Sequence, residues 1–458
     1  MALIWAKGFT GEKALAPAWL AWNQAIAQCK ATPPEEAQRF SVATIAERAA
    51  QERYQGLVKE ATDALAATAQ ALTHVMIVGV GKYDAASNIP MVTTSVNGAR
   101  KFAEWALTKF TKEDRPLGSV EFLCSTADGQ AEWEPVEAAQ TALGFDAPVK
   151  AFSGEPATFQ NIKAAFDRWL ARAGTKLENA AIWYFSGHGI FKSEAIIMAQ
   201  DSRLPSEDLP GENLIAPTQT LYRLQSRQPS VQCFFIDACS EYNAAILNNP
   251  MELPAQPLCG PNNKPAIPNR DATIYFGSYA GGKAYGLAND APFFTQELVA
   301  CLTKRAGDPT YEGSQVTLSS LSQALKAAAS YRAELEKNDD IRFAETKPGV
   351  VGGSGVICDL VGPQEIIVQV RCLPNDAMSR AKLYMTQASN GLRVDRAKPA
   401  NGFWYTIVTP GKWTANADLD NTTYMCLANP FEPKPPVFDA MIKIQAIVVA
   451  GRVGGGGA

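Results

Sequence analysis

The chain has 458 residues, of which 47% are hydrophobic and 19% charged, as expected for a globular protein with more than one domain. A net charge of −4 disfavours nucleic-acid binding, and no apolar run reaches the roughly 18 residues of a membrane span. The stretch MALIWAKGFTGEK lacks the apolar core of a signal peptide, and nine cysteines without paired spacing are typical of reduced thiols. We therefore expect a cytoplasmic protein without membrane insertion.

Residues 1–73 are rich in alanine and favour helices, most clearly in QERYQGLVKEATDALAATAQALTH. We expect these helices to pack on the neighbouring domain. The alternative is an inhibitory segment or one that binds an activating partner.

Residues 74–336 alternate short apolar runs with amphipathic stretches. The apolar runs suit buried strands of a mostly parallel sheet, at 74–80, 119–125, 180–186, 194–200, 231–239 and 272–280. Helical spacing is found at 97–110, 158–174, 218–227, 293–304 and 317–336. This pattern predicts an α/β domain of three layers, with helices on both faces of one sheet.

The C-terminal part has a different pattern. Residues 337–363 include KPGVVGGSGV and predict a glycine-rich linker. From 364 to 450, short alternating strands and turn signals predict a small antiparallel β-sandwich, which resembles carbohydrate-binding or PEGA-like sandwiches. Residues 451–458, GRVGGGGA, are expected to be flexible. The sandwich aromatics form either its core, as we expect, or a binding platform; they include Trp404, Tyr405 and Trp413.

Metal and nucleotide chemistry are disfavoured. The chain has only two histidines, His74 and His188, and no HExxH or Cys-x-x-Cys motif. In VGVGKYD, Tyr83 follows Lys82 where a phosphate-binding loop needs Ser or Thr, and Asp84 breaks the dinucleotide fingerprint. We expect no metal site and no cofactor.

Two strands end in residues that can perform nucleophilic chemistry. The stretch AIWYFSGHGIF places His188 between two glycines after one strand, and CFFIDACSEYN places Cys239 at the end of another. Ligands bind beyond the carboxyl ends of parallel strands, so these two side chains are expected to meet. An imidazole that takes the thiol proton creates a strong nucleophile and can then protonate an amine leaving group. The pair predicts acyl transfer, although a turn histidine and a buried cysteine are the structural alternatives.

The boxes YFSGHG and FIDAC, with their histidine and cysteine 51 residues apart, resemble those of caspase-like cysteine peptidases, the bacterial-type caspase and metacaspase group of clan CD. VMIVGVGKYD, TTSVNGARKFAEWAL and FGSYAGGKAYGLANDAPFFTQEL are similar to other parts of that family, so the resemblance covers about residues 74–336. It implies a caspase-like fold in which His188 is general base and acid and Cys239 is the nucleophile. The amides of Gly189 and Cys239 would form the oxyanion hole.

The resemblance also implies a substrate pocket. Asp237 matches the acid by which metacaspases select Arg or Lys before the scissile bond, and Ser278 and Tyr279 match substrate-binding positions. A buried carboxylate needs a cationic partner. The second acid of the metacaspase pattern is absent, because Asn97-Gly98-Ala99 stands in its place. Specificity is therefore expected to be relaxed, and the alternative is that Asp237 is a structural acid bonded to neighbouring amides.

Within the family, the domain divides into a large-subunit part (74–247), a linker (248–271) and a small-subunit part (272–336). Six prolines in the linker predict an exposed loop, and self-cleavage is expected after Arg270. The alternative is a linker that stays intact. Calcium dependence of the metacaspase kind could use Glu207 and Asp208, which more simply belong to a solvated loop.

The sequence thus predicts a cysteine endopeptidase that cleaves a protein substrate after Arg or Lys, in a signalling or defence response. The alternative is a catalytically silent scaffold that recruits partners through residues 1–73 or 364–450. The intact His188 and Cys239 favour the enzyme.

Overall fold

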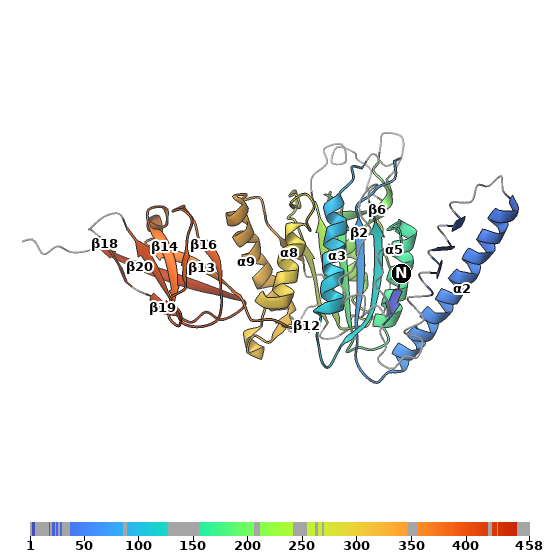
Figure 1. Cartoon of the computed structure of the whole chain (residues 1–458), viewed down its shortest axis with the longest axis horizontal. Helices are drawn as coiled ribbons and strands as arrows, with labels where there is room; N and C mark the ends of the chain where they lie inside the picture. The colour runs from blue at the N-terminus through green and yellow to red at the C-terminus, as the bar shows by residue number, and fades with distance from the viewer. Residues whose placement is uncertain are drawn as a thin grey trace, which may run out of the picture.

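A seven-stranded sheet forms the centre of the structure, which is a computed structural model (Figure 1). In order across the sheet its strands are β1 (Ala2–Ile4), β3 (Leu117–Ser125), β2 (Thr73–Val80), β4 (Ala180–Gly187), β8 (Val231–Ala238), β9 (Asp271–Phe276) and β11 (Ala344–Thr346). The five inner strands run parallel, and β1 and β11 pair antiparallel at the edges. The structure describes residues 2–4, single positions between 18 and 29, 37–85, 89–126, 155–205, 211–240, 254–261, 264–267, 270–346, 355–419, 424–427 and 429–446.

Helices cover both faces of this sheet, and each face has its own apolar core (Figure 1). One face carries α3 (Thr93–Thr108), α8 (Phe293–Ala300) and α9 (Leu318–Glu336), and the other carries α5 (Phe159–Ala173) and α6 (Pro217–Arg223). Side chains of β4 alternate between the two cores. Tyr184 stacks on Phe102 of α3 with ring centroids 4.5 Å apart, whereas Trp183 packs against Phe166 of α5. The predicted three-layer α/β fold is confirmed.

The N-terminal region is helical over α2 (Ala37–Ala67), which spans 31 residues and lies beyond α5 at one end of the molecule (Figure 1). The prediction of helices throughout residues 1–73 is wrong at both ends of this region. Ala2–Ile4 forms edge strand β1 against β3, and Thr73 already belongs to β2. An antiparallel strand at this position pairs backbone groups of β3 that would otherwise form an open sheet edge.

A second, three-stranded antiparallel sheet lies beyond the end of β4. It consists of β5 (Gly189–Phe191), β6 (Ala195–Arg203) and β7 (Glu212–Ile215). The apolar run 194–200 was expected in the main sheet, but its residues belong to β6. This small sheet holds the chain directly after His188, because Met198 N–H donates to the His188 carbonyl at 3.1 Å.

The C-terminal region is the predicted β-sandwich. One sheet has β16 (Trp404–Val408), β13 (Ile366–Leu373), β20 (Val437–Ala446) and β18 (Tyr424–Leu427), and the other has β15 (Arg393–Asp395), β14 (Lys382–Gln387), β17 (Trp413–Asp418) and β19 (Asn429–Phe431). All pairs are antiparallel except β13 with β20, which run parallel. Trp404 and Trp413 are buried in the sandwich core, as expected, and Tyr405 packs against the core of the α/β domain.

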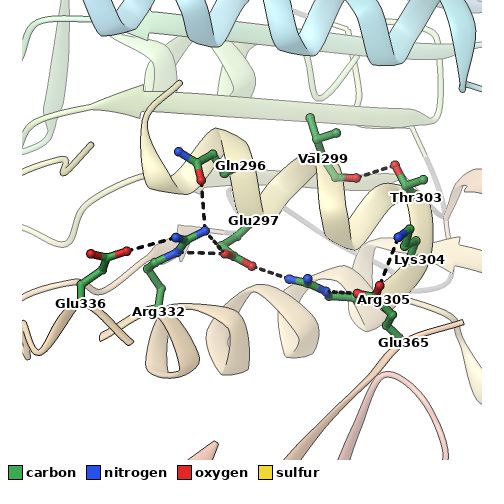
Figure 2. A network of polar contacts seen from close by, with 9 residues as sticks. All are labelled: Gln296, Glu297, Val299, Thr303, Lys304, Arg305, Arg332, Glu336 and Glu365. Atoms are coloured by element: carbon green, nitrogen blue, oxygen red, sulfur yellow. Dashed lines mark hydrogen bonds and ion pairs between the residues drawn. The ribbon is translucent and has the colours of Figure 1, made fainter. Parts of the chain in front are cut away.

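The sandwich is fixed to the α/β domain by a shared core and a charge network. Ile367 of β13 is fully buried in the cluster that α9 also joins. Figure 2 shows Glu297 of α8 bonded to Arg305 and Arg332, while Arg305 also binds Glu365 at the start of the sandwich. The predicted linker 337–363 contains β11 and β12 (Val356–Asp359), the latter paired with β10 (Gln315–Thr317), so its described parts are integrated into the fold. Residues 347–354 and 451–458 lie outside the described residues.

Candidate active site

Strands β4 and β8 bring the predicted histidine and cysteine together. They pair in parallel with Gly187 opposite Ala238, and His188 and Cys239 directly follow the ends of these two neighbouring strands. Neighbouring strands lie about 4.8 Å apart, which is within reach of both side chains. Each of the two residues is partly exposed at the carboxyl edge of the sheet. The two residues are therefore adjacent in the backbone, and their role as a catalytic pair stays a prediction.

One contact fixes the protonation pattern of the His188 ring. Its Nε2 lies 2.9 Å from the carbonyl oxygen of Pro90. A carbonyl only accepts hydrogen bonds, so Nε2 carries the proton of the neutral ring and Nδ1 is the basic nitrogen. The ring can then take the proton of a thiol through Nδ1 without changing tautomer.

The sulfur of Cys239 is held by the loop after β9. The backbone N–H of Ala284 donates to Sγ at 3.3 Å. Two further backbone bonds fix the residue after Cys239, because Ser240 N–H donates to Gly282 at 2.9 Å and Gly281 N–H donates to Ser240 at 2.7 Å. An amide that donates to sulfur favours the thiolate over the thiol, since hydrogen bonds to the charged form stabilise it.

Gly189 allows the two strand ends to approach closely. A Cβ atom at this position would lie only 2.5 Å from the carbonyl oxygen of Cys239 and 3.0 Å from Cβ of Ala238. No other residue fits there without displacing backbone. The glycine thus allows its backbone to lie close to the carbonyl of Cys239, and the role of its amide in an oxyanion hole stays a prediction.

Asp237 lies on the same face of β8 as Cys239, two residues before it. Its carboxyl is 2% exposed, and Oδ2 accepts from both the N–H, at 3.2 Å, and the hydroxyl of Thr295 at the start of α8. Oδ1 has no hydrogen-bond partner among the described residues. Burial raises the pKa of the Asp237 carboxyl to about 7. Asp237 is therefore partly the structural acid of the alternative interpretation, bonded through Oδ2, and its role in selecting Arg or Lys stays a prediction.

Gly98 stands where the metacaspase pattern has a second acid, and the structure leaves no room for one. A Cβ atom on Gly98 would lie 2.6 Å from the hydroxyl of Tyr184 and 3.3 Å from Oγ of Ser186. The Tyr184 hydroxyl in turn contacts Thr295. Neutral hydroxyl groups thus occupy the place of the missing carboxylate.

Ser278 and Tyr279 belong to the loop after β9, which contacts Cys239 and Ser240. Ser278 is buried and its hydroxyl donates to the carbonyl of Ala238 at 2.9 Å, which supports the end of β8. Tyr279 is half-buried, with the guanidinium of Arg342 5.8 Å from its ring centroid. Their role in substrate binding stays a prediction.

The structure contradicts the exposure on which self-cleavage after Arg270 was predicted. Arg270 is 1% exposed. Its guanidinium donates to the side chain of Gln232 at 2.7 Å and 3.1 Å and to the carbonyl of Leu221 at 2.7 Å. Asp271 directly begins β9, so a protease cannot bind this peptide bond in the folded conformation. Of the predicted exposed loop 248–271, residues 248–253, 262–263 and 268–269 lie outside the described residues.

The remaining predicted features lie elsewhere. Glu207 and Asp208 lie outside the described residues, and within the described part no three His, Cys, Asp or Glu side chains are grouped to hold a metal. His74 is buried on β2, where burial lowers its pKa to about 3 and Nδ1 contacts Ser119 at 2.8 Å. His74 belongs to the core and lies at the start of β2, away from the carboxyl edge of the sheet.

Sequence reasoning missed four residues that contact His188, Cys239 or Asp237. Tyr83, Pro90 and Ala284 act through backbone groups or a hydroxyl, and Thr295 reaches Asp237 from 58 residues away. For Tyr83 and Pro90 the sequence offered one signal. Both follow β2, which ends at the same sheet edge as β4 and β8.

Comparisons with known proteins show what part of this chain is similar to. Residues 123–337, slightly less than half of the chain, match the caspase domain family, peptidase family C14. The uncharacterized protein y4kE of Sinorhizobium fredii is 27% identical over 218 residues, which cover 47% of this chain and 58% of that protein, less than two thirds of its length. The crystal structure of caspase-1 from Spodoptera frugiperda aligns with 62% of this chain and 91% of its own, at 11% identity and a TM-score of 0.35.

The matched segment contains both His188 and Cys239 but begins inside β3. It therefore omits β2 and α3, although β2 lies between β3 and β4 in the sheet. Among the residues that the structure describes, no helix combines the length and the apolar character needed to cross a bilayer.

Proposed function

We propose that this chain, whose residues 123–337 form a caspase-like peptidase domain, is a cysteine endopeptidase that cleaves a protein substrate after Arg or Lys. The observation that carries the proposal is the register of β4 and β8, which makes His188 and Cys239 neighbours at the carboxyl edge of the sheet. Cys239 is partly exposed and lies at this edge of the sheet.

The proposed reaction proceeds in two stages. Nδ1 of His188 takes the Cys239 thiol proton, and the thiolate attacks the peptide carbonyl carbon to form a tetrahedral intermediate. The amides of Gly189 and Cys239 stabilise its oxyanion. The intermediate collapses as Nδ1–H protonates the leaving amine, which gives a thioester. Water, deprotonated by His188, then attacks the thioester and releases the carboxylic acid product and the thiol.

Asp237 supports the preference for a basic residue before the scissile bond. Oδ1 is buried and has no hydrogen-bond partner among the described residues. An Arg or Lys side chain would supply that partner and a compensating charge. Thr295 engages the other oxygen, and no second acid lies at Gly98, so the preference is weaker than in a pocket with two carboxylates.

The proposed setting is a signalling or defence response in the cytoplasm, with an activating partner that binds residues 1–73 or 364–450. The catalytically silent scaffold remains the second candidate. It is favoured by the closely docked sandwich, since a shared core makes residues 364–446 a rigid extension of the α/β domain.

A peptide-library digestion by the full chain tests the two candidates. We expect cleavage after Arg and Lys, and a fall in kcat of about 10³ or more in Cys239→Ala and in His188→Ala, because each removes one member of a cooperating pair. Cys259→Ala, which removes a buried cysteine outside the proposed pair, is the control and should retain wild-type kcat. Absence of cleavage by the folded wild-type chain favours the scaffold, and equal cutting after Asp, Leu and Arg removes Asp237 from the pocket.

A further inference from the structure

Tyr83 lies against the predicted catalytic histidine. It follows β2 by three residues and is 5% exposed. Its hydroxyl oxygen accepts a hydrogen bond from the backbone N–H of His188 at 2.7 Å. The two rings are tilted by 47° with centroids 5.2 Å apart. Tyr83 therefore contacts both the backbone and the ring of His188.

The space for this hydroxyl is created by a glycine. A Cβ atom on Gly187 would lie 3.0 Å from the Tyr83 hydroxyl and 2.8 Å from the Phe185 ring. Burial raises the pKa of the Tyr83 phenol, so the hydroxyl stays protonated and neutral beside the dyad. Gly187 thus leaves room for the Tyr83 phenol at the end of β4.

The segment that carries Tyr83 is anchored at both ends. At its start, the N–H groups of Gly81 and Lys82 donate to the Ser125 carbonyl at 2.8 Å and 3.1 Å. At its end, Val92 N–H donates to the Gly81 carbonyl at 2.8 Å. The same segment supplies the Pro90 carbonyl that binds Nε2 of His188. Described residues on both sides of 86–88 therefore hold His188 at two points, Tyr83 at its backbone amide and Pro90 at its ring.

We infer that Tyr83 is a positioning residue for His188, whose hydroxyl holds the histidine backbone so that the ring can meet both Pro90 and Cys239. This inference rests on the proposed Cys-His chemistry. If the hydroxyl is removed, the His188 amide loses its acceptor and the ring keeps the contact with Pro90 without this support of the backbone. A ring displaced by a fraction of an ångström transfers the thiol proton less efficiently, while substrate binding is unchanged.

The test compares two buried tyrosines, Tyr83 after β2 and Tyr275 in β9. Tyr83→Phe removes the hydroxyl at His188, and Tyr275→Phe removes a hydroxyl that donates to the Leu318 carbonyl at 2.7 Å, away from the dyad. We expect Tyr83→Phe to lower kcat about tenfold or more with KM within about twofold of wild type, whereas Tyr275→Phe keeps wild-type kinetics. Thermal melting of each variant reports any loss of stability.

Alkylation of Cys239 by iodoacetamide, followed by mass spectrometry, is a second readout that does not need a substrate. We expect slower alkylation at pH 7 in Tyr83→Phe and in His188→Ala, but not in Tyr275→Phe. Gly187→Ala, which displaces the phenol from the other side, should act in the same direction and replaces Tyr83→Phe if that variant does not fold. Wild-type kcat and alkylation in Tyr83→Phe would overturn the inference, as would equal losses in the two tyrosine variants.

The two readouts also separate this inference from the proposed peptidase. If the wild-type chain cleaves no peptide but the alkylation of Cys239 depends on His188 and Tyr83, the peptidase fails and the positioning role stands. If peptides are cleaved and Tyr83→Phe is fully active, the peptidase stands and the positioning role fails.

Discussion

Asp237→Asn should make the stability of the protein less sensitive to pH. Burial raises the pKa of this carboxyl from its ordinary value of 3.8 to about 7 in the folded chain. Between these two values the unfolded chain is ionised at Asp237 while the folded chain keeps the proton. Wild-type stability from this group is therefore fully present below the ordinary pKa and is lost as the pH rises through the folded value.

The size of this loss follows from the two pKa values. Ionisation of Asp237 removes about 2.5 kcal/mol from the free energy of unfolding between pH 5 and pH 8, at about 1.4 kcal/mol per unit of pKa difference. An asparagine cannot ionise, so the stability of the variant relative to wild type should rise by about this amount. The amide N–H replaces an oxygen that has no described partner and costs about 1–3 kcal/mol, but this cost is the same at both pH values.

Urea unfolding at pH 5 and at pH 8 measures the difference directly. Asp339→Asn is the matched control, because Asp339 is exposed, and its stability relative to wild type should not change between the two pH values. Parallel pH dependence of wild type and Asp237→Asn would refute the reasoning. It would mean that the folded carboxyl ionises as it does in water and that Oδ1 has found a partner.

Three other measurements test the surroundings of the site. Gly98→Asp should lower the free energy of unfolding by about 1–3 kcal/mol, because its Cβ would meet the Tyr184 hydroxyl, and a stable variant with stronger Arg selectivity would contradict this. Glu365→Gln should cost about 1 kcal/mol at pH 7 in urea unfolding and less at acidic pH, since hydrogen bonds from Arg305 and Lys304 help to hold the pKa of Glu365 below its usual range. Intact-mass spectrometry of the active chain should show no new N-terminus at Asp271, because Arg270 is buried, and a new terminus there in wild type but not in Cys239→Ala would restore self-cleavage.

The layered fold and the pairing of His188 with Cys239 could be predicted because both depend on strand patterning. Continuous apolar runs such as AIWYFS and CFFIDA mark strands that are buried on both faces. Once two such strands are parallel neighbours, the residues after them share one edge whatever the loops do. The structure adds the register, Gly187 opposite Ala238, which no apolar run specifies.

The environment of the site could not be predicted, because it depends on contacts between segments distant in sequence. Pro90 acts through its carbonyl oxygen, which every residue type possesses, so the residue name carries no signal. Arg270 looked like a loop cation between asparagine and aspartate, yet its guanidinium is buried through hydrogen bonds to Gln232 and Leu221. Composition indicates that a segment lacks regular structure, but it does not say whether individual side chains of that segment point inward.

Helix α8 connects the candidate site to the sandwich. At its first turn, Thr295 binds the Asp237 carboxyl, and two residues later Glu297 binds Arg305, which binds Glu365 of the sandwich (Figure 2). Glu297 is 3% exposed on its side chain and also accepts from Arg332 of α9, so its charge is compensated by two guanidinium groups within the interface. A helix of eight residues is rigid over this distance, because its backbone bonds span successive turns. Any displacement of the sandwich that breaks the Glu365 contact therefore acts, through Arg305 and Glu297, on the same short helix that binds Oδ2 of Asp237.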